Sequence, residues 1–211
     1  MRRIARMLGL CALLLPMAAW ADPILINKYG SVSITDSGIV STGSQLVSFF
    51  GIDAAPGGAL GSVSFSTGAL TSGSIWSGGT FAGGQGSSFV VFGVGPWAKR
   101  LTGENTNRVT LFVANFVGPI HWKLDSRTGY HYVFTLSGIV AGELFNGRDT
   151  RGITKQYISV YQNQWSRDHR GGISSGSTDF RVNLPEPGTL GLFGMGVIVM
   201  GSAIRRKLLR V

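Results

Sequence analysis

Apolar and polar residues alternate along the stretch from Ile120 to Leu136. The apolar members are Ile120, Trp122 and Leu124 before a turn at 125–129, and Tyr130, Tyr132, Phe134 and Leu136 after it. A period of two places successive side chains on opposite faces of a strand. The pattern therefore predicts a hairpin with Trp122 and Tyr132 facing the core. The polar residues predicted to face solvent are His121, Lys123 and His131.

Further strand patterns flank this hairpin. Residues 109–116 and 156–161 are rich in β-branched and aromatic residues, which favour strands. Gly118-Pro119 lies between the first of these runs and the hairpin, and we expect it to end that strand within a meander. Shorter apolar runs occur in the first half of the chain, at 30–35, 45–52 and 61–66.

Glycine and serine dominate residues 67–88. Two structures fit this composition: a flexible loop, since glycine is costly to order, or short sheet edges joined by tight glycine turns. No stretch between residues 22 and 183 shows the pattern of a helix of ordinary length. We therefore expect these residues to form one all-β domain, an antiparallel β-sandwich or jelly-roll-like fold.

The N-terminal 21 residues have the pattern of a secretory signal peptide. Three arginines precede an uncharged apolar run at 7–18, and Ala19-Trp20-Ala21 follows as a small-x-small cleavage site. The prediction implies Sec-type export and removal of residues 1–21 by signal peptidase. Cys11, the single cysteine, leaves with this segment. The mature chain then has no disulfide and depends on its core alone.

Three features follow one another in residues 184–211. Pro185-Glu186-Pro187 comes first and predicts an extended break, because proline fixes φ and removes a backbone donor. The segment 190–204 is apolar and uncharged, and with residues 188 and 189 it predicts a membrane helix at about 188–204. A basic end at 205–210 follows, and the positive-inside rule places it in the cytoplasm. Its cations are Arg205, Arg206, Lys207 and Arg210.

This three-part order resembles the PEP-CTERM sorting signal of exported bacterial proteins. The resemblance implies recognition by an exosortase at the inner membrane, removal of the tail and delivery of the body to the cell surface. Such systems are associated with extracellular polysaccharide. The body, through stretches such as VANFVGPIHWKL and YHYVFTLSGIVAGEL, resembles small PEP-CTERM proteins of acidobacteria whose function is unassigned.

The charge of the chain is divided among these three regions. The formal net charge of +9 comprises +3 from the predicted signal peptide, +3 from the residues after Asn183 and +3 from residues 22–183. Two thirds of the excess therefore belongs to the two targeting segments. The body has no clustered basic stripe, so the sequence does not favour nucleic-acid binding.

The motifs for chemistry lack the context that they require. Residues 172–176 spell the nucleophile elbow, but no histidine follows Ser174, so we interpret this stretch as a glycine-serine loop. His121 and His131 lie on polar sides of neighbouring strands, yet two imidazoles are fewer than a dedicated metal site needs. We therefore expect no catalytic residues, no metal and no cofactor.

Two functional hypotheses follow from the residues and the resemblance. The first is a non-enzymatic protein of the cell envelope or extracellular matrix, sorted through its tail by an exosortase. The second is a polysaccharide-binding module, in which exposed Trp76, Trp97, Trp165 or Tyr161 stacks on sugar rings. A third, ice binding, lacks the regular threonine repeat that a flat array needs. In all three the precursor is held at the inner membrane before it reaches the surface.

Overall fold

The structure is a computed structural model that describes residues 24–161 and 170–181. Its elements in chain order are β1 (Ile24–Lys28), β2 (Ser31–Thr35), β3 (Gly38–Phe49), β4 (Ile52–Asp53), β5 (Gly61–Ser66), β6 (Leu70–Ser74), β7 (Gly78–Phe81), β8 (Ser88–Val94), α2 (Pro96–Thr102), β9 (Arg108–Thr128), β10 (His131–Leu144), β11 (Asp149–Tyr161) and β12 (Arg170–Arg181). The described residues are therefore almost entirely β, as the alternating pattern predicts.

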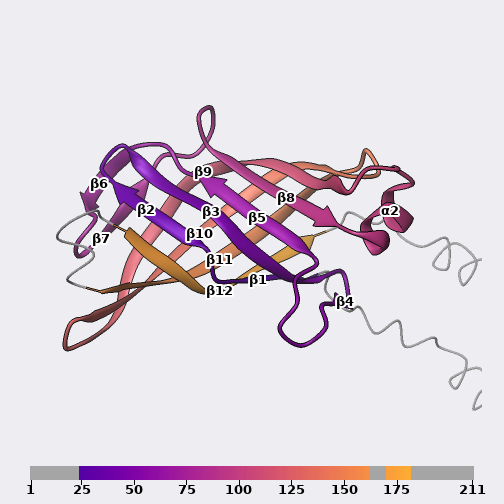
Figure 1. Cartoon of the computed structure of the whole chain (residues 1–211). Coiled ribbons are helices and arrows are strands. Elements are labelled where there is room, and N and C mark those ends of the chain that lie inside the picture. Colours follow the sequence, from indigo (N-terminus) through magenta and orange to yellow (C-terminus); the bar gives the residue numbers. More distant parts are fainter. Residues whose placement is uncertain (1–23, 162–169, 182–211) are drawn as a thin grey trace, which may run out of the picture. The chain divides into compact units, whose positions relative to one another are not determined.

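Eight of these strands close into an antiparallel barrel. Neighbours follow the order β10, β11, β12, β1, β3, β5, β8 and β9, and β9 also pairs with β10, which completes the ring. β2 continues the course of β1, since it too lies between β12 and β3. The β6–β7 hairpin pairs with the second half of β9. Figure 1 shows this hairpin at one end of the barrel and α2 at the other.

The predicted sandwich or jelly roll is therefore wrong. A sandwich and a barrel share the same alternation of buried and exposed residues, and they differ only in whether the outermost strands pair with each other. Here β9 bonds to β8 on one edge and to β10 on the other, so the sheet closes. The length of β9, 21 residues, gives it room for β7 as well.

We expected Gly118-Pro119 to end a strand, but the structure places it within β9. The register with β10 shifts between Ser137 and Ile139, where β9 accommodates extra residues as a bulge. Gly118 has a φ of 76°, which suits glycine, and a proline within a bulge need not donate to the ladder. The bulge thus makes one long strand from two predicted segments.

The one helix among the described residues is short. α2 spans seven residues, begins with Pro96 and is capped after Thr102 by Gly103 in the left-handed conformation. No helix in residues 24–161 and 170–181 is long and apolar enough to cross a membrane. The structure therefore gives no support to the membrane helix expected at about 188–204, a segment that lies outside the described residues.

Residues 67–88, for which the composition left two possibilities, form sheet edges rather than a loop. β6 and β7 pair with each other, and Phe81 of β7 lies opposite Ile120 of β9. Phe81 is fully buried. The glycines serve the tight pairing: a Cβ on Gly73 would lie 2.4 Å from the carbonyl oxygen of Gly78.

Large aromatic side chains fill the barrel. The buried rings include Phe49, Phe65, Phe81, Phe89, Phe112, Phe116, Trp122, Phe134 and Phe180. Phe89 contacts Phe112 and Phe116 edge to face, at centroid distances of 6.2 and 6.1 Å. Such aromatic pairs add to the free energy gained from burial, which a chain without disulfides needs.

The predicted β9–β10 hairpin has the expected facing of its side chains. Trp122 is 2% exposed and its indole nitrogen donates to the carbonyl oxygen of Ile75, while His121 and Lys123 are exposed. Tyr132 is half-buried near the end of the barrel. The guanidinium carbon of Arg127 lies 5.0 Å from the centroid of its ring and covers one side of it. The turn is shorter than predicted and consists of residues 129 and 130 alone.

Candidate functional site

The outer face of β9, β10 and β11 carries polar and aromatic side chains over the half nearest the β9–β10 turn. The pairing aligns them in rows: Thr135 lies between Lys123 and Tyr157, and Ser137 lies between His121 and Lys155. We call this surface the polar-aromatic face and define it by eight residues. They are His121, Lys123, Asp125, His131, Thr135, Lys155, Tyr157 and Tyr161.

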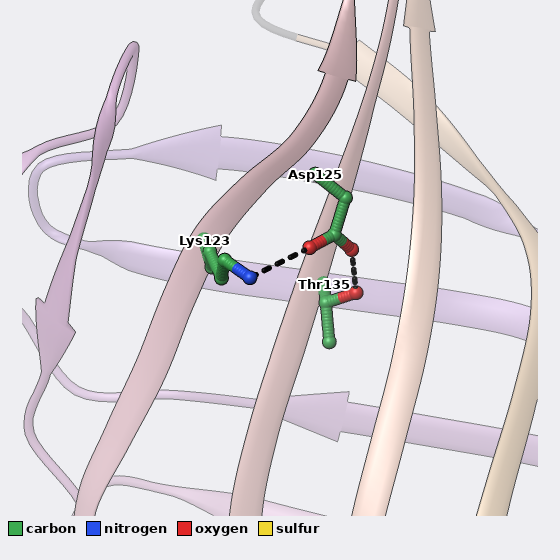
Figure 2. A network of polar contacts seen from close by, with 3 residues as sticks. All are labelled: Lys123, Asp125 and Thr135. Atoms are coloured by element: carbon green, nitrogen blue, oxygen red, sulfur yellow. Dashed lines mark hydrogen bonds and ion pairs between the residues drawn. The ribbon is translucent and has the colours of Figure 1, made fainter.

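Asp125 joins two side chains of this face (Figure 2). Its carboxylate accepts a hydrogen bond from the Thr135 hydroxyl and lies 3.6 Å from the ammonium of Lys123. The register of β9 on β10 shifts here, since Phe134 pairs with Leu124 while Val133 pairs with Ser126. Asp125 is the extra residue of that bulge, and bulges commonly re-aim a side chain.

The two charged groups, Lys123 and Asp125, differ in their access to solvent. The side chain of Lys123 is 78% exposed and that of Asp125 is 30% exposed. The ion pair therefore contributes little to stability, as is usual at a surface. Lys123, Asp125 and Thr135 together offer an ammonium donor, a carboxylate acceptor and a hydroxyl, and these groups suit a ligand rich in hydroxyl groups.

Aromatic rings stand beside these polar groups. Tyr161 is 52% exposed and Tyr157 is 40% exposed. Both point outward from β11, four residues apart, which is about 14 Å along a strand. The ring of His131 lies 4.8 Å from that of Tyr161. Because β11 is paired with β10 and β12, the two tyrosines are mounted on a rigid surface.

The tryptophans proposed from the sequence lie elsewhere. Trp76 is 52% exposed in the turn between β6 and β7. Trp97 in α2 is half-buried, and its indole nitrogen donates to the carbonyl oxygen of Leu60 at 3.0 Å. These two elements occupy opposite ends of the barrel (Figure 1), so the two tryptophans share no face. Trp165 lies outside the described residues.

His121 and His131 do not converge. His121 pairs with Ser137, which is six residues along β10 from His131. That separation is about 20 Å along a strand. Within residues 24–161 and 170–181, no three His, Cys, Asp or Glu side chains gather as a metal site would require.

The stretch at 172–176 is strand rather than loop. It lies in β12, and the Ser174 hydroxyl donates to the backbone carbonyl of Tyr157 at 2.9 Å. A nucleophile elbow needs a turn from a strand into a helix. The serine here instead helps to attach β12 to the backbone of β11.

A second polar cluster lies inside the barrel. The amides of Asn27 and Gln156 hydrogen-bond each other, at 2.9 and 3.2 Å, and Asn27 also donates to Ser44. Gln156 donates further to Thr154, which in turn accepts from Thr178. All five side chains are fully buried. Since these groups bond one another, the cluster is a structural belt across the core.

Sequence reasoning missed Tyr157 and His131 as candidate binding residues. The signal was present in the alternation of residues 153–161, where Ile158 and Val160 mark the buried parity and Tyr157 and Tyr161 the exposed one. Residue type had drawn attention to three tryptophans and to Tyr161, and of these Tyr161 lies on the polar-aromatic face. The position of Asp125 depends on the bulge and could not be read from alternation.

The residues of the predicted targeting segments lie outside the described residues. These are Ala19 and Ala21 at the signal cleavage site, and Pro185, Glu186, Pro187, Arg205, Arg206 and Lys207 in the sorting tail. The structure therefore places only the body of the chain, and the tail is identified by comparison of sequences.

Residues 183–207 match the family model of the PEP-CTERM protein-sorting motif. No curated protein and no solved structure matches the chain. The match coincides with the predicted tail, including the Pro-Glu-Pro motif and the first three cations of the basic end. The chain therefore carries a PEP-CTERM protein-sorting motif, through which exosortase processing sorts it to the cell surface.

Proposed function

We propose that this chain is a non-enzymatic protein of the cell envelope or extracellular matrix, and that its barrel binds polysaccharide there. The observation that supports the binding role is the polar-aromatic face. Tyr157 and Tyr161 stand outward from a strand paired on both sides, next to a hydrogen-bonding group of Lys123, Asp125 and Thr135.

Sugar rings offer two kinds of surface, and this face has a counterpart for each. Their C–H faces pack on flat aromatic rings, as exposed tyrosines provide. Their hydroxyl groups both donate and accept hydrogen bonds, which the carboxylate of Asp125 and the ammonium of Lys123 match. The face is the outer, convex side of a barrel and can therefore lie along an extended polymer.

The same geometry supports a role without catalysis. Enzymes place their reacting groups in concave sites that exclude water. The polar groups of this face stand instead on an open strand surface, where the Lys123 side chain is 78% exposed. Such an arrangement suits reversible adhesion to a polymer.

Export precedes this role. We propose that Sec-type machinery exports the chain, that signal peptidase removes residues 1–21 after Ala21, and that the precursor waits at the inner membrane for its exosortase. The sequence motifs at both ends support this order. The barrel then folds outside the cytoplasm, where its lack of disulfides makes it independent of oxidation.

The proposal is tested by co-sedimentation of the full-length chain with the extracellular polysaccharide of its own host. We expect Tyr157→Ala/Tyr161→Ala to lose most of the binding. A matched control removes exposed side chains from the opposite side of the ring: Val40→Ala/Val94→Ala on β3 and β8. Equal binding by both double variants would show that the polar-aromatic face is not the binding surface.

A further inference from the structure

Charges are unevenly distributed over the outer face of β9 to β12. An apolar row crosses this face, because Ile139 lies opposite Val117 of β9 and Ile153 of β11. Val117 and Ile153 are each 42% exposed. The row separates the polar-aromatic face from the half of the barrel nearer α2.

The two sides of the row carry opposite net charge. Toward the β9–β10 turn, Lys123, Lys155 and Arg170 stand against Asp125, which is +3 and −1, or a formal +2. On the other side, the outward charges of β9 to β12 are Arg108 and Arg151 against Glu143, Asp149 and Asp179, which is +2 and −3, or −1. A ligand with distributed negative charge would therefore be attracted more strongly to the first half than to the second.

The cations adjoin the exposed rings. Lys155 is two residues from Tyr157 on the same side of β11. Arg170, at the start of β12, is next to Gly171, which backs onto the interior residue Val160. Arg170 therefore points outward and is exposed, beside the end of β11 where Tyr161 stands.

The partial neutralisation of Asp125 increases this asymmetry. Asp125 is the only carboxylate on the polar-aromatic face, and Lys123 and Thr135 both bond it. Within residues 24–161 and 170–181, neither Lys155 nor Arg170 forms an ion pair, so both cations can meet a ligand.

We infer that the ligand of the polar-aromatic face is an acidic polysaccharide, one that bears carboxylates along its chain. The inference rests on the proposed polysaccharide-binding function and specifies its substrate class. Tyr157 and Tyr161 stack on sugar rings while Lys155 and Arg170 pair with the carboxylates. The acidic half beyond the apolar row confines the polymer to the half nearer the β9–β10 turn.

Polygalacturonate and dextran serve as an acidic and a neutral probe. The full-length chain, kept in mild detergent, is titrated with each at low salt and at 0.5 M salt. We expect polygalacturonate to bind at least tenfold more tightly than dextran and to lose most of that advantage at 0.5 M salt, where surface charges are strongly screened. Far-UV circular dichroism and thermal melting verify that every variant folds.

Matched substitutions distinguish binding at the polar-aromatic face from binding through the overall positive charge of the chain. Lys155→Gln/Arg170→Gln should weaken polygalacturonate binding about five- to tenfold, the effect of losing two exposed charge pairs. Arg151→Gln removes a cation four residues from Lys155 on the same strand, but across the apolar row, and should leave binding unchanged. Tyr157→Ala/Tyr161→Ala should weaken binding of both probes.

The outcomes distinguish the inference from the proposed function. Equal affinity for the two probes, with both affected by the tyrosine variants, overturns the acidic specificity and leaves the binding function intact. Binding of polygalacturonate that depends on the cations but not on the tyrosines, or that falls equally with Arg151→Gln, indicates nonspecific ion exchange and overturns the inference. If neither probe nor the host polysaccharide binds, the proposed function itself fails.

Discussion

The indole of Trp122 stacks on the ring of Phe134 across the β9–β10 pair, with centroids 4.3 Å apart and planes 8° from parallel. Tyr132 continues the stack at 6.4 Å from Phe134. Both Trp122 and Phe134 are almost completely buried. This column of rings connects the end of the hairpin to the core, and its first member also donates a hydrogen bond to Ile75.

Loss of this indole should therefore be costly. We expect Trp122→Ala to lower the free energy of unfolding by about 3–5 kcal/mol, through lost burial and the cavity that remains. Lys123→Ala, one residue along the strand, should change it by no more than about 0.5 kcal/mol because Lys123 faces solvent. Urea unfolding of the full-length chain measures both. Similar losses from the two variants would mean that the register of β9 is shifted by one residue.

The interior polar belt gives a second prediction. A Cβ on Gly176 would lie 2.0 Å from the side-chain oxygen of Gln156 and 2.5 Å from that of Asn27. Gly176→Ala must displace the two amides that bond each other, and we expect a loss of about 1–3 kcal/mol in unfolding free energy.

Gly172 is the matched control for Gly176. It lies in the same strand, and its nearest neighbour is a carbonyl oxygen 3.5 Å from the Cβ position, an ordinary contact. Gly172→Ala should be neutral or slightly stabilising, because alanine restricts the unfolded chain. Denaturant melts that rank the two variants in the reverse order would contradict the packing of the belt.

Substitutions of Trp97 and Trp76 should separate effects on stability from effects on binding. Trp97 packs at 6.3 Å from the ring of Phe49 and donates to Leu60, so Trp97→Ala should cost about 2 kcal/mol or more of unfolding free energy. It should leave polysaccharide binding unchanged, since α2 is at the far end of the barrel from the polar-aromatic face.

Trp76→Ala is the companion variant for binding. Trp76 is half exposed, so its loss should destabilise the fold less than loss of Trp97 does. Its turn borders the polar-aromatic face, because Gly78 pairs with Lys123. Thermal melts and co-sedimentation of both variants test this contrast. If Trp97→Ala weakened binding more than Trp76→Ala, the polysaccharide would bind at the α2 end of the barrel, and the proposed binding surface would be wrong.

Alternation predicted the local structure well because it reports only which side of a strand is buried. It identified the hairpin from Ile120 to Leu136 and the parity of Trp122 without any knowledge of neighbouring strands. Closure of the sheet depends instead on contacts far apart in sequence, such as Val91 with Phe112 and Leu25 with Thr178. No local pattern encodes these pairings, so a sandwich and a barrel were equally compatible with the sequence.

The candidate site was predictable only in part for a related reason. Exposure of Tyr157 and Tyr161 follows from alternation within β11, but their position beside Lys123 and Thr135 depends on the register of three strands. The Asp125 bulge sets that register locally. Choosing tryptophans by residue type ignored burial, and Trp97 is held by a hydrogen bond to Leu60.

The sorting tail gives the last prediction, and it concerns the cations at its end. Moving a charge to the centre of a bilayer costs about 2.5–3.5 kcal/mol on insertion scales. Arg205, Arg206 and Lys207 should therefore resist translocation and hold the precursor at the inner membrane while Pro185-Glu186-Pro187 is presented to the exosortase. We expect the wild-type body to lose a C-terminal epitope and to leave the inner membrane fraction.

Two altered strains test this order of events by fractionation in the native host. A strain without its exosortase should retain the full precursor, epitope included, at the inner membrane. Changing Arg205, Arg206 and Lys207 together to Ser should reduce processing, because Arg210 alone then remains in the basic end to retain the tail against translocation. Tyr157→Ala/Tyr161→Ala is the matched control, since it alters the barrel face and should be processed as wild type. If the epitope stays joined to the body in the wild-type strain at steady state, the tail is retained rather than removed, and the proposed step at the inner membrane is wrong.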